Sequence, residues 1–164
     1  MTEFQLTELA TKVVEKLKNE NKTLGLAESC TGGWLSKIIT DVSGASSVYL
    51  GGICSYSNTV KMNLLGVKEE TLKLYGAVSK QTAREMAIGA RKSLGSDIGV
   101  GITGIAGPLS DNTNKSVGLI YVAVAYEDTV TVKELNNKFT DNIRLNNRLS
   151  AVETALGLLG GINE

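Results

Sequence analysis

Hydrophobic residues recur every three or four positions at both ends of the chain, which is the spacing of a helix with one buried face. The first such stretch covers residues 3–20, and Thr2 with Gln5 has the spacing of a capping box in front of it. The last covers residues 142–159. Its apolar side is expected to carry Leu145, Leu149, Val152, Leu156 and Leu159. The remaining helices are expected over residues 32–41, 58–65, 69–74 and, after an N-cap at Ser79, 80–94.

Short apolar runs between these helices predict strands. Residues 97–103 alternate glycine with isoleucine or valine, which is typical of a buried strand with close neighbours. Two later runs are separated only by Glu127 and Asp128, which indicates an antiparallel hairpin. The expected strands are residues 23–28, 48–56, 97–103, 117–126 and 129–139. This alternation predicts a three-layer α/β/α sandwich with a mixed, mostly parallel sheet, as a single domain over residues 1–164.

The most informative feature of the composition is that the 164 residues include no histidine, which limits the kinds of catalytic and metal site that the chain can form. Catalytic dyads with an imidazole base and histidine-ligated metal sites are therefore excluded, and we expect no metal and no cofactor. The 17 basic residues balance the 17 acidic ones, and aromatic residues are 5% of the chain, so a nucleic-acid partner is not expected. The longest apolar run, residues 117–126, is too short for a membrane span. With two cysteines and no C-x-x-C pair, we expect a reduced, cytoplasmic protein.

The first candidate site is the Glu28-Ser29-Cys30-Thr31-Gly32-Gly33 segment, between an expected strand and an expected helix. Ligands of open α/β sheets bind at this kind of edge, and free helix N–H groups there can hold a phosphate or an oxyanion. Ser29 is a candidate nucleophile, with the Gly32 and Gly33 amides as anion donors. Alternatively, Ser29 or Thr31 is an N-cap and the glycines form a tight turn. Cys30 is either an activated thiol or a small residue of the hydrophobic core.

The second candidate is Tyr56 with Lys61, at the end of a strand and in the first turn of the following helix. The helix dipole there favours a neutral amine, which is the form that a general base requires, although a plain exposed lysine fits the pattern too.

The third candidate is the glycine turn at residues 101–108, where successive N–H groups can form an anion-binding nest or simply a structural turn. Arg144 and Arg148, spaced i and i+4 on the last helix, can clamp an anion or lie on a solvated flank.

Together these segments resemble the CinA C-terminal domain family, whose members include nicotinamide-nucleotide amidohydrolases. The similarity rests on AESCTGGWLSKIITDVSGAS, YSNTVKMNLLGV, GAVSKQTAREMAIGA and GITGIAGP, which stand in the family's order and span nearly the whole chain. The resemblance implies a three-layer α/β/α fold and hydrolysis of the carboxamide of nicotinamide mononucleotide to nicotinate mononucleotide and ammonia. It also implies the stand-alone form of the domain, rather than one fused behind a molybdopterin-binding-like domain. We expect self-association as well.

The resemblance places the nucleophile at Ser29, the lysine base at Lys61 and the tyrosine at Tyr56. Ser29 would form an acyl-enzyme while Lys61 takes its proton, directly or through Tyr56. Glu28 is expected to contact a ligand hydroxyl or to pair with Lys61. The other residues expected to bind substrate are Thr31, Gly32, Gly33, Thr103, Gly104, Ala106, Gly107, Lys115, Arg144 and Arg148.

The chain departs from the family pattern at two places. The loop after Gly107-Pro108 lacks the usual Gly-Gly pair and reads Leu109-Ser110-Asp111-Asn112, and the Gly-Asp-Arg before the last helix is replaced by Asp141-Asn142-Ile143-Arg144. Both segments are expected to touch substrate. A catalytically silent nucleotide-binding module and an amidase for another small amide are therefore the alternative functions.

Overall fold

The sequence-predicted elements are present with their ends shifted by a few residues in the computed structural model, which describes residues 1–161. The helices are α1 (Glu3–Asn19), α2 (Trp34–Thr40), α3 (Asn58–Leu65), α4 (Glu69–Tyr75), α5 (Lys80–Leu94) and α6 (Ile143–Gly160). The strands are β1 (Leu24–Glu28), β2 (Tyr49–Cys54), β3 (Ile98–Gly104), β4 (Leu119–Tyr126) and β5 (Thr129–Asn136), and one 3-10 turn (η1) spans Ala45–Ser47. Thr2 and Gln5 form the expected capping box, and Ser79 caps α5.

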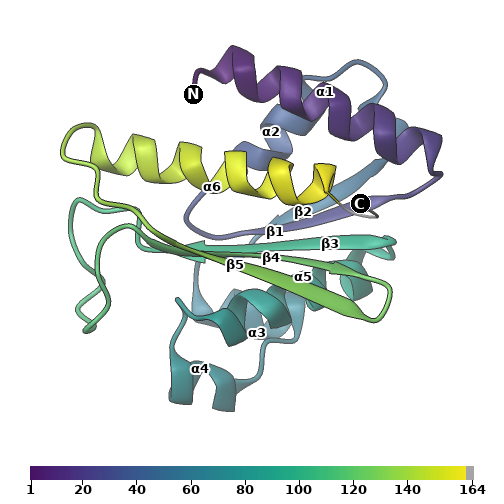
Figure 1. Ribbon diagram of the computed structural model, residues 1–164. Helices are drawn as coiled ribbons and strands as arrows, with labels where there is room; N and C mark the ends of the chain where they lie inside the picture. The colour runs from purple at the N-terminus through teal and green to yellow at the C-terminus, as the bar shows by residue number, and fades with distance from the viewer. Residues whose placement is uncertain (162–164) are drawn as a thin grey trace.

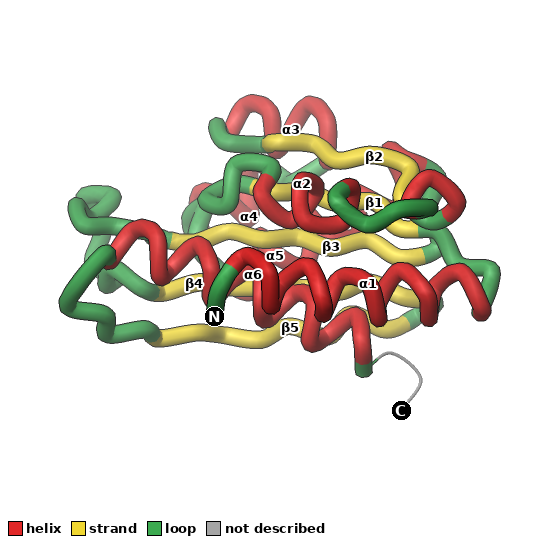
Figure 2. The backbone as a smooth tube through the Cα atoms, turned by 90° about the horizontal axis from the view of Figure 1, so that it is seen from above, coloured by secondary structure: helices red, strands yellow, loops and turns green. Residues whose placement is uncertain are grey.

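The five strands form one sheet in the order β2-β1-β3-β4-β5. The strands β2, β1 and β3 run parallel to one another, whereas β3 with β4 and β4 with β5 pair antiparallel. The predicted mixed sheet is confirmed, but its pairings are evenly divided rather than mostly parallel, because the predicted hairpin supplies one antiparallel pairing and its docking on β3 a second. Figure 2 shows this strand order from above.

Helices cover both faces of the sheet, as predicted for a three-layer sandwich. In Figure 1, α1, α2 and α6 lie on one side of the strands and α3, α4 and α5 on the other. The chain leaves β1 toward one face, through α2, and leaves β2 toward the opposite face, through α3. Because β1 lies between β2 and β3, its carboxyl end is the point where successive connections diverge, and such points are where open α/β sheets bind ligands.

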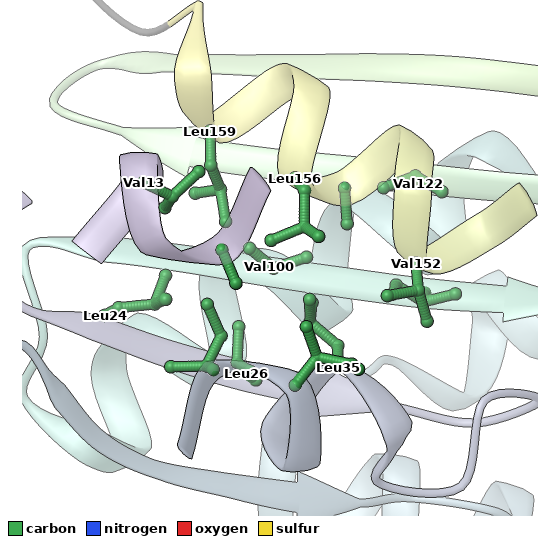
Figure 3. Close-up of a cluster of buried hydrophobic side chains, with 14 of the residues drawn as sticks. Val13, Leu24, Leu26, Leu35, Val100, Val122, Val152, Leu156 and Leu159 are labelled. Carbon is green, nitrogen blue, oxygen red and sulfur yellow. The ribbon is translucent and has the colours of Figure 1, made fainter. Parts of the chain in front are cut away.

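The main hydrophobic core lies between the sheet and the α1, α2 and α6 layer. Figure 3 shows side chains from the three helices meeting side chains from the central strands. The labelled residues are Val13, Leu24, Leu26, Leu35, Val100, Val122, Val152, Leu156 and Leu159. All are at most 3% exposed, so this layer holds α2, and with it the turn that follows β1, in a fixed position.

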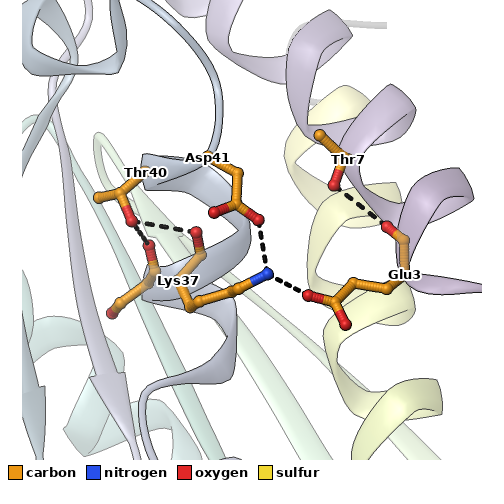
Figure 4. Close-up of polar contacts among 6 residues, drawn as sticks. Glu3, Thr7, Lys37, Thr40 and Asp41 are labelled. Carbon is orange, nitrogen blue, oxygen red and sulfur yellow. Dashed lines mark hydrogen bonds and ion pairs between the residues drawn. The ribbon is translucent and has the colours of Figure 1, made fainter.

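An ion-pair network joins α1 to α2 at the surface. The ammonium of Lys37 contacts the carboxylate of Asp41 at 2.7 Å and also that of Glu3 on α1 (Figure 4). The two carboxylates raise the pKa of Lys37. Since these side chains are well exposed, the network contributes little to the free energy of unfolding.

The buried face of α6 differs from the expectation in its first turns. Leu145 is 47% exposed, while Asn147, two residues later, is only 1% exposed. The buried stripe of α6 consists of Asn147, Ala151, Val152, Ala155, Leu156 and Leu159. The helix therefore enters the fold with a polar side chain turned inward, which has consequences for the site described next. Among the described residues, no helix has the length and apolar character needed to cross a membrane.

Candidate active site

The carboxyl ends of the three parallel strands meet around a cleft of about 270 Å³. Ser29 follows β1, Tyr56 follows β2 and Thr103 lies at the end of β3. The cleft is lined by Ser29, Cys30, Tyr56, Lys61, Ala77, Val78, Thr103, Gly104, Ile105, Ala106, Gly107, Leu109, Ser110, Asp111 and Arg144. Small-molecule sites typically enclose roughly 300–1,000 Å³, so this volume suits a small ligand or one end of a larger one.

Ser29 and Lys61 are in direct contact although 32 residues separate them in the sequence. The Nζ of Lys61 lies 3.1 Å from the Oγ of Ser29. Lys61 also donates to the carbonyl oxygens of Ser55 at 2.7 Å and Tyr56 at 3.3 Å. Ser29 is held in turn by its own N–H, which donates to the carbonyl of Ile102 on β3. The distance is within the hydrogen-bond reach that a nucleophile and its general base require.

Lys61 is only 1% exposed and shares the buried side of α3 with Leu65. It lies in α3 after the N-cap Ser57, and the helix directs it toward the sheet rather than toward solvent. Burial lowers the pKa of Lys61 to about 8, because removing water from an ammonium disfavours its charged form. The direction agrees with the prediction from the sequence, but its main cause is desolvation rather than the helix dipole.

Glu28 is buried beside this pair but belongs to the opposite side of the sheet. Its carboxylate accepts hydrogen bonds from the Thr31 hydroxyl at 2.6 Å, from the N–H groups of Gly33 and Leu35, and from both the N–H and hydroxyl of Ser36. It thus caps the N-terminus of α2. The expected ion pair with Lys61 is wrong, since these donors hold the carboxylate on the α2 side of the sheet. The contacts of Glu28 and Thr31 with a ligand stay predictions.

The glycine amides assigned to anion binding have other acceptors. The N–H of Gly32 donates to the carbonyl of Ser29, and that of Gly33 donates to Glu28. Both glycines have positive φ angles, 60° and 95°, which explains why glycine occupies the turn. Among the described residues, the N–H groups of this turn that have no acceptor are those of Cys30 and Thr31. Of the two residues Cys30 alone lines the cleft, so its N–H is the candidate of this turn for binding an anion beside Ser29.

Cys30 is a core residue and not an activated thiol. It is 7% exposed, and burial raises the pKa of its thiol to about 12. A thiol that keeps its proton is a poor nucleophile. The alternative that Cys30 is a small core residue is confirmed. Its backbone, and not its thiol, is left to take part in the site.

Tyr56 and Arg144 close the outer side of the cleft. Tyr56 is 67% exposed, and its hydroxyl lies 3.4 Å from a guanidinium nitrogen of Arg144. Arg144 also donates to the carbonyl of Gly107 at 3.0 Å. Only the backbone carbonyl of Tyr56 contacts Lys61, so the side chains of Ser29 and Lys61 meet directly, without the phenol between them.

The glycine turn after β3 forms the floor of the cleft. The hydroxyl of Thr103 donates to the carbonyl of Ala77 at 2.7 Å, which ties the end of β3 to the loop before α5. Gly104 lies so close to β4 that a Cβ there would be 2.7 Å from a side-chain carbon of Ile120. Ala106 and Gly107 line the cleft, and their N–H groups have no acceptor among the described residues, so these groups remain candidates for binding an anion.

Six residues assigned to substrate lie outside the lining of the cleft: Glu28, Thr31, Gly32, Gly33, Lys115 and Arg148. The ammonium of Lys115 donates to the carbonyls of Tyr75 and Val78 and so fastens the loop at residues 109–118 to the loop before α5. The guanidinium of Arg148 donates to the carbonyls of Cys30 and Thr31 and is directed at the protein backbone. Of the three basic residues expected to bind phosphate, Arg144 alone lines the cleft.

Sequence reasoning missed two polar residues around the site. Asn147 donates to the carbonyl of Ala106 at 2.9 Å. Ser55 is fully buried, and its hydroxyl has no hydrogen-bond partner among residues 1–161. Asn147 had a usable signal, since it stands four residues before Ala151 on a small, apolar stripe. Ser55 lies in an irregular segment, where no periodicity marks an inward residue.

The loop at residues 109–112 lies at the cleft, as expected from its departure from the family pattern. Leu109, Ser110 and Asp111 all line the cleft.

A family model described as "CinA C-terminal domain" matches residues 6–162. Among curated proteins, a "CinA-like protein" of Syntrophomonas wolfei is 48% identical over 151 residues, which cover 92% of this chain and 36% of that protein. A "CinA-like protein" of Thermotoga maritima is 42% identical over 149 residues, covering 91% and 36%. The chain spans about a third of the length of these curated relatives.

Solved structures of similar length share the fold. The competence/damage inducible protein CihA of Agrobacterium tumefaciens superposes with a TM-score of 0.90 at 37% identity, covering 97% of this chain and 96% of that one. A CinA superfamily protein of Klebsiella pneumoniae superposes with a TM-score of 0.88 at 30% identity, covering 94% and 95%. The likeness extends over all the layers of the fold, including the strand ends that form the cleft.

Proposed function

Because this chain belongs to the CinA C-terminal domain family, we propose that it is an amidohydrolase that converts nicotinamide mononucleotide to nicotinate mononucleotide and ammonia. In this proposal Ser29 is the nucleophile and Lys61 the general base. Family membership suggests the substrate, and the geometry of the cleft supports the reaction type.

The observation that carries the proposal is the set of three contacts around the Nζ of Lys61. Two of the partners, the carbonyls of Ser55 and Tyr56, can only accept hydrogen bonds. A neutral amine has two N–H groups to satisfy them, and its lone pair is then left for the O–H of Ser29. With a pKa of about 8, a substantial fraction of Lys61 is neutral near pH 7 to 8. Burial and backbone contacts together thus prepare a base in a chain that has no histidine.

The reaction proceeds through an acyl-enzyme. The Oγ of Ser29 attacks the amide carbon and its proton moves to Lys61. The tetrahedral intermediate then expels ammonia, which receives that proton from Lys61. Water attacks the resulting ester of Ser29 and gives its proton to Lys61, and collapse of this second intermediate releases the carboxylic acid and returns the proton to Ser29.

The free N–H groups that follow Ser29 are suited to stabilise the oxyanion of these intermediates. The N–H of the residue after a nucleophile is a common oxyanion donor, and the N–H of Cys30 takes this place here. Removing one such donor in other enzymes lowers kcat by about 10²–10³-fold. The buried Cys30 side chain serves this role only by fixing its own backbone in the core.

The phosphate of the substrate is assigned to the opposite end of the cleft. Arg144 supplies a cation there, and the free N–H groups of Ala106 and Gly107 supply further donors. Replacing Arg144 with alanine is expected to raise KM for the mononucleotide at least tenfold and to leave the KM for nicotinamide riboside, which lacks phosphate, within about twofold.

The test of the proposed reaction is release of ammonia from nicotinamide mononucleotide by the purified chain. Ser29→Ala is expected to abolish turnover, and so is Lys61→Arg, because a guanidinium does not lose its proton at working pH. Lys12→Arg, an exposed substitution on α1, is the matched control and should match the wild type. Full turnover by Ser29→Ala would remove the nucleophile from the proposal.

One observation favours a second candidate substrate. The carboxylate of Asp111 lines the mouth of the cleft near the only arginine in its lining, so the net charge there is lower than a phosphate site usually provides. An uncharged small amide is the alternative that this arrangement supports. A panel of amides with and without the ribose phosphate distinguishes the two, and calorimetric binding without product would indicate a silent nucleotide-binding module instead.

The chain's domain organisation and assembly belong to the same proposal. We regard residues 1–164 as one catalytic unit that self-associates. Sedimentation of the purified chain over a range of concentrations tests the self-association.

A further inference from the structure

Arg148 of helix α6 donates hydrogen bonds to backbone carbonyl oxygens of the candidate active site. Arg148 donates from Nε to the carbonyl of Cys30 at 3.1 Å and from a terminal nitrogen to the carbonyl of Thr31 at 3.0 Å. Both carbonyls belong to the turn that directly follows Ser29. No role in binding or in chemistry explains these contacts, because Arg148 does not line the cleft.

These hydrogen bonds determine the direction of the backbone N–H groups that neighbour the two carbonyls. A trans peptide bond holds its C=O and the following N–H on opposite sides of one plane. When Arg148 holds the carbonyl of Cys30, the N–H of Thr31 must point away from α6. Arg148 also holds the carbonyl of Thr31, and the same peptide plane carries the N–H of Gly32. That N–H donates to the carbonyl of Ser29, whose plane carries the N–H of Cys30. The direction of the Cys30 N–H is thus set by the turn and by Arg148 together.

Arg148 is itself held in place from its other side. Its guanidinium carbon lies 5.1 Å from the centroid of the Trp34 ring, at the start of α2. A planar guanidinium stacks well on an aromatic face and still presents its N–H groups at the edge. A lysine would have to reach both carbonyls from one nitrogen and would offer the ring no planar face. The pairing thus explains why an arginine on a half-buried stretch of α6 is directed at a turn instead of at solvent.

We infer that Arg148 is a positioning residue, which holds the Ser29–Thr31 turn so that the free N–H of Cys30 faces the oxyanion of the reaction. The inference rests on the proposed function for the meaning of that oxyanion. It separates Arg148 from Arg144, which the cleft geometry assigns to substrate binding. It predicts that loss of Arg148 lowers kcat and hardly changes KM, because the substrate-contacting groups stay in place while transition-state stabilisation is lost.

The test compares Arg148→Ala and Arg148→Lys with the wild type in the ammonia-release assay. We expect kcat to fall about 100-fold in Arg148→Ala and about 10-fold in Arg148→Lys, with KM within threefold in both. Added guanidinium ion should restore part of the lost kcat in Arg148→Ala. Arg84→Ala, which removes an exposed arginine of α5, is the matched control and should leave kcat unchanged. A wild-type kcat in either Arg148 variant, or a rise in KM alone, overturns the inference.

Two further readouts separate this role from a general loss of folding. Trp34 is the only tryptophan of the chain, so its fluorescence reports on the ring beneath Arg148. Its emission should shift in Arg148→Ala and return with guanidinium, while far-ultraviolet circular dichroism stays that of the wild type. If Arg148→Ala does not fold, Arg148→Lys carries the kinetic test alone.

A serine-directed probe keeps the inference testable without the natural substrate. A fluorophosphonate forms an oxygen–phosphorus bond with Ser29 and loses fluoride, while the serine proton passes to Lys61, and the attack places negative charge on the phosphoryl oxygen. Labelling followed by intact mass should be at least tenfold slower in Arg148→Ala than in the wild type. If the wild type is labelled but hydrolyses no amide, the proposed substrate is wrong. The inference is then tested by the labelling rate of Arg148→Ala relative to that of the wild type. Equal labelling rates overturn the inference alone, and a wild type without labelling or turnover overturns both.

Discussion

The buried ammonium of Lys61 predicts an unusual dependence of stability on pH. At neutral pH the folded protein carries the unfavourable charged form of a side chain that is 1% exposed, while the unfolded chain hydrates it. Replacing Lys61 with methionine, which has a similar length and no charge, removes this penalty. The difference in unfolding free energy between the wild type and Lys61→Met should therefore change with pH across the range in which Lys61 titrates.

The magnitude follows from the lowered pKa. The folded value of about 8 stands against 10.5 for a hydrated lysine, and each unit is worth about 1.4 kcal/mol. Between these two values the unfolded chain binds more protons than the folded one, so wild-type stability rises with pH there. Relative to Lys61→Met, the wild type should gain about 3 kcal/mol between pH 7 and pH 10.5. Below about pH 8 the penalty is fully present and the difference should be flat.

The methionine variant also leaves the carbonyls of Ser55 and Tyr56 without the ammonium. That cost is roughly 1–3 kcal/mol for each buried acceptor, but it does not depend on pH, so it shifts the difference without changing its slope. The slope is thus the quantity to measure, and the sign of the difference at any one pH carries no weight.

Urea unfolding of both proteins at half-unit steps from pH 6.5 to 10.5 measures this slope, and the exposed substitution Lys12→Met serves as the control with no slope expected. The titrations of all other groups are common to the proteins and cancel in the difference. Curves for wild type and Lys61→Met that remain parallel through this range would show that Lys61 is hydrated in the folded state. The argument for a neutral base would then lose its physical ground.

Three further predictions use the same site. The value of kcat/KM should rise tenfold per pH unit below about pH 8 and level off above it, since only neutral Lys61 accepts the proton of Ser29; an activity profile that is flat from pH 6 to 9 contradicts this assignment. Glu28→Gln should lower the unfolding free energy by about 3 kcal/mol in urea titrations, because an amide nitrogen then faces N–H donors at the start of α2; a change below 1 kcal/mol would mean that the cap is dispensable. Ser55→Ala should leave ammonia release within twofold and keep or slightly raise the unfolding free energy, because it removes a buried hydroxyl without a partner among the described residues; a tenfold loss of kcat would instead give that hydroxyl a part in proton transfer.

The sequence by itself determined the elements and their layering. Apolar periodicity located α1 and α5 to within a residue or two, and the capping residues Thr2 and Ser79 marked their starts. These signals are local, because a cap or an amphipathic stripe acts within one or two turns of its own helix. The same reasoning failed at the start of α6, where Asn147 and not Leu145 is buried. There the hydrogen bond to Ala106, a contact from 41 residues away, outweighs local hydrophobicity.

The roles of the site residues were decided by the tertiary structure. Patterns in the sequence singled out Ser29 and Lys61, but only the meeting of β1 with α3 brings their side chains within 3.1 Å. Glu28, beside Ser29 in the sequence, and Arg148, on the last helix, were also assigned to the ligand. The fold directs Glu28 to the cap of α2 and Arg148 to the backbone after Ser29.

The roles depend on the fold because the sequence gives the type of each side chain but not the environment in which it lies. Whether a carboxylate meets N–H donors or a ligand, and whether an ammonium keeps its water, depends on which face of the sheet it reaches and on what packs there. Adjacent residues of a strand point to opposite faces, so Glu28 and Ser29 are neighbours in the chain and serve different layers of the fold. The sequence thus identifies the residue types of the site, and the three-dimensional structure decides which role each of them has.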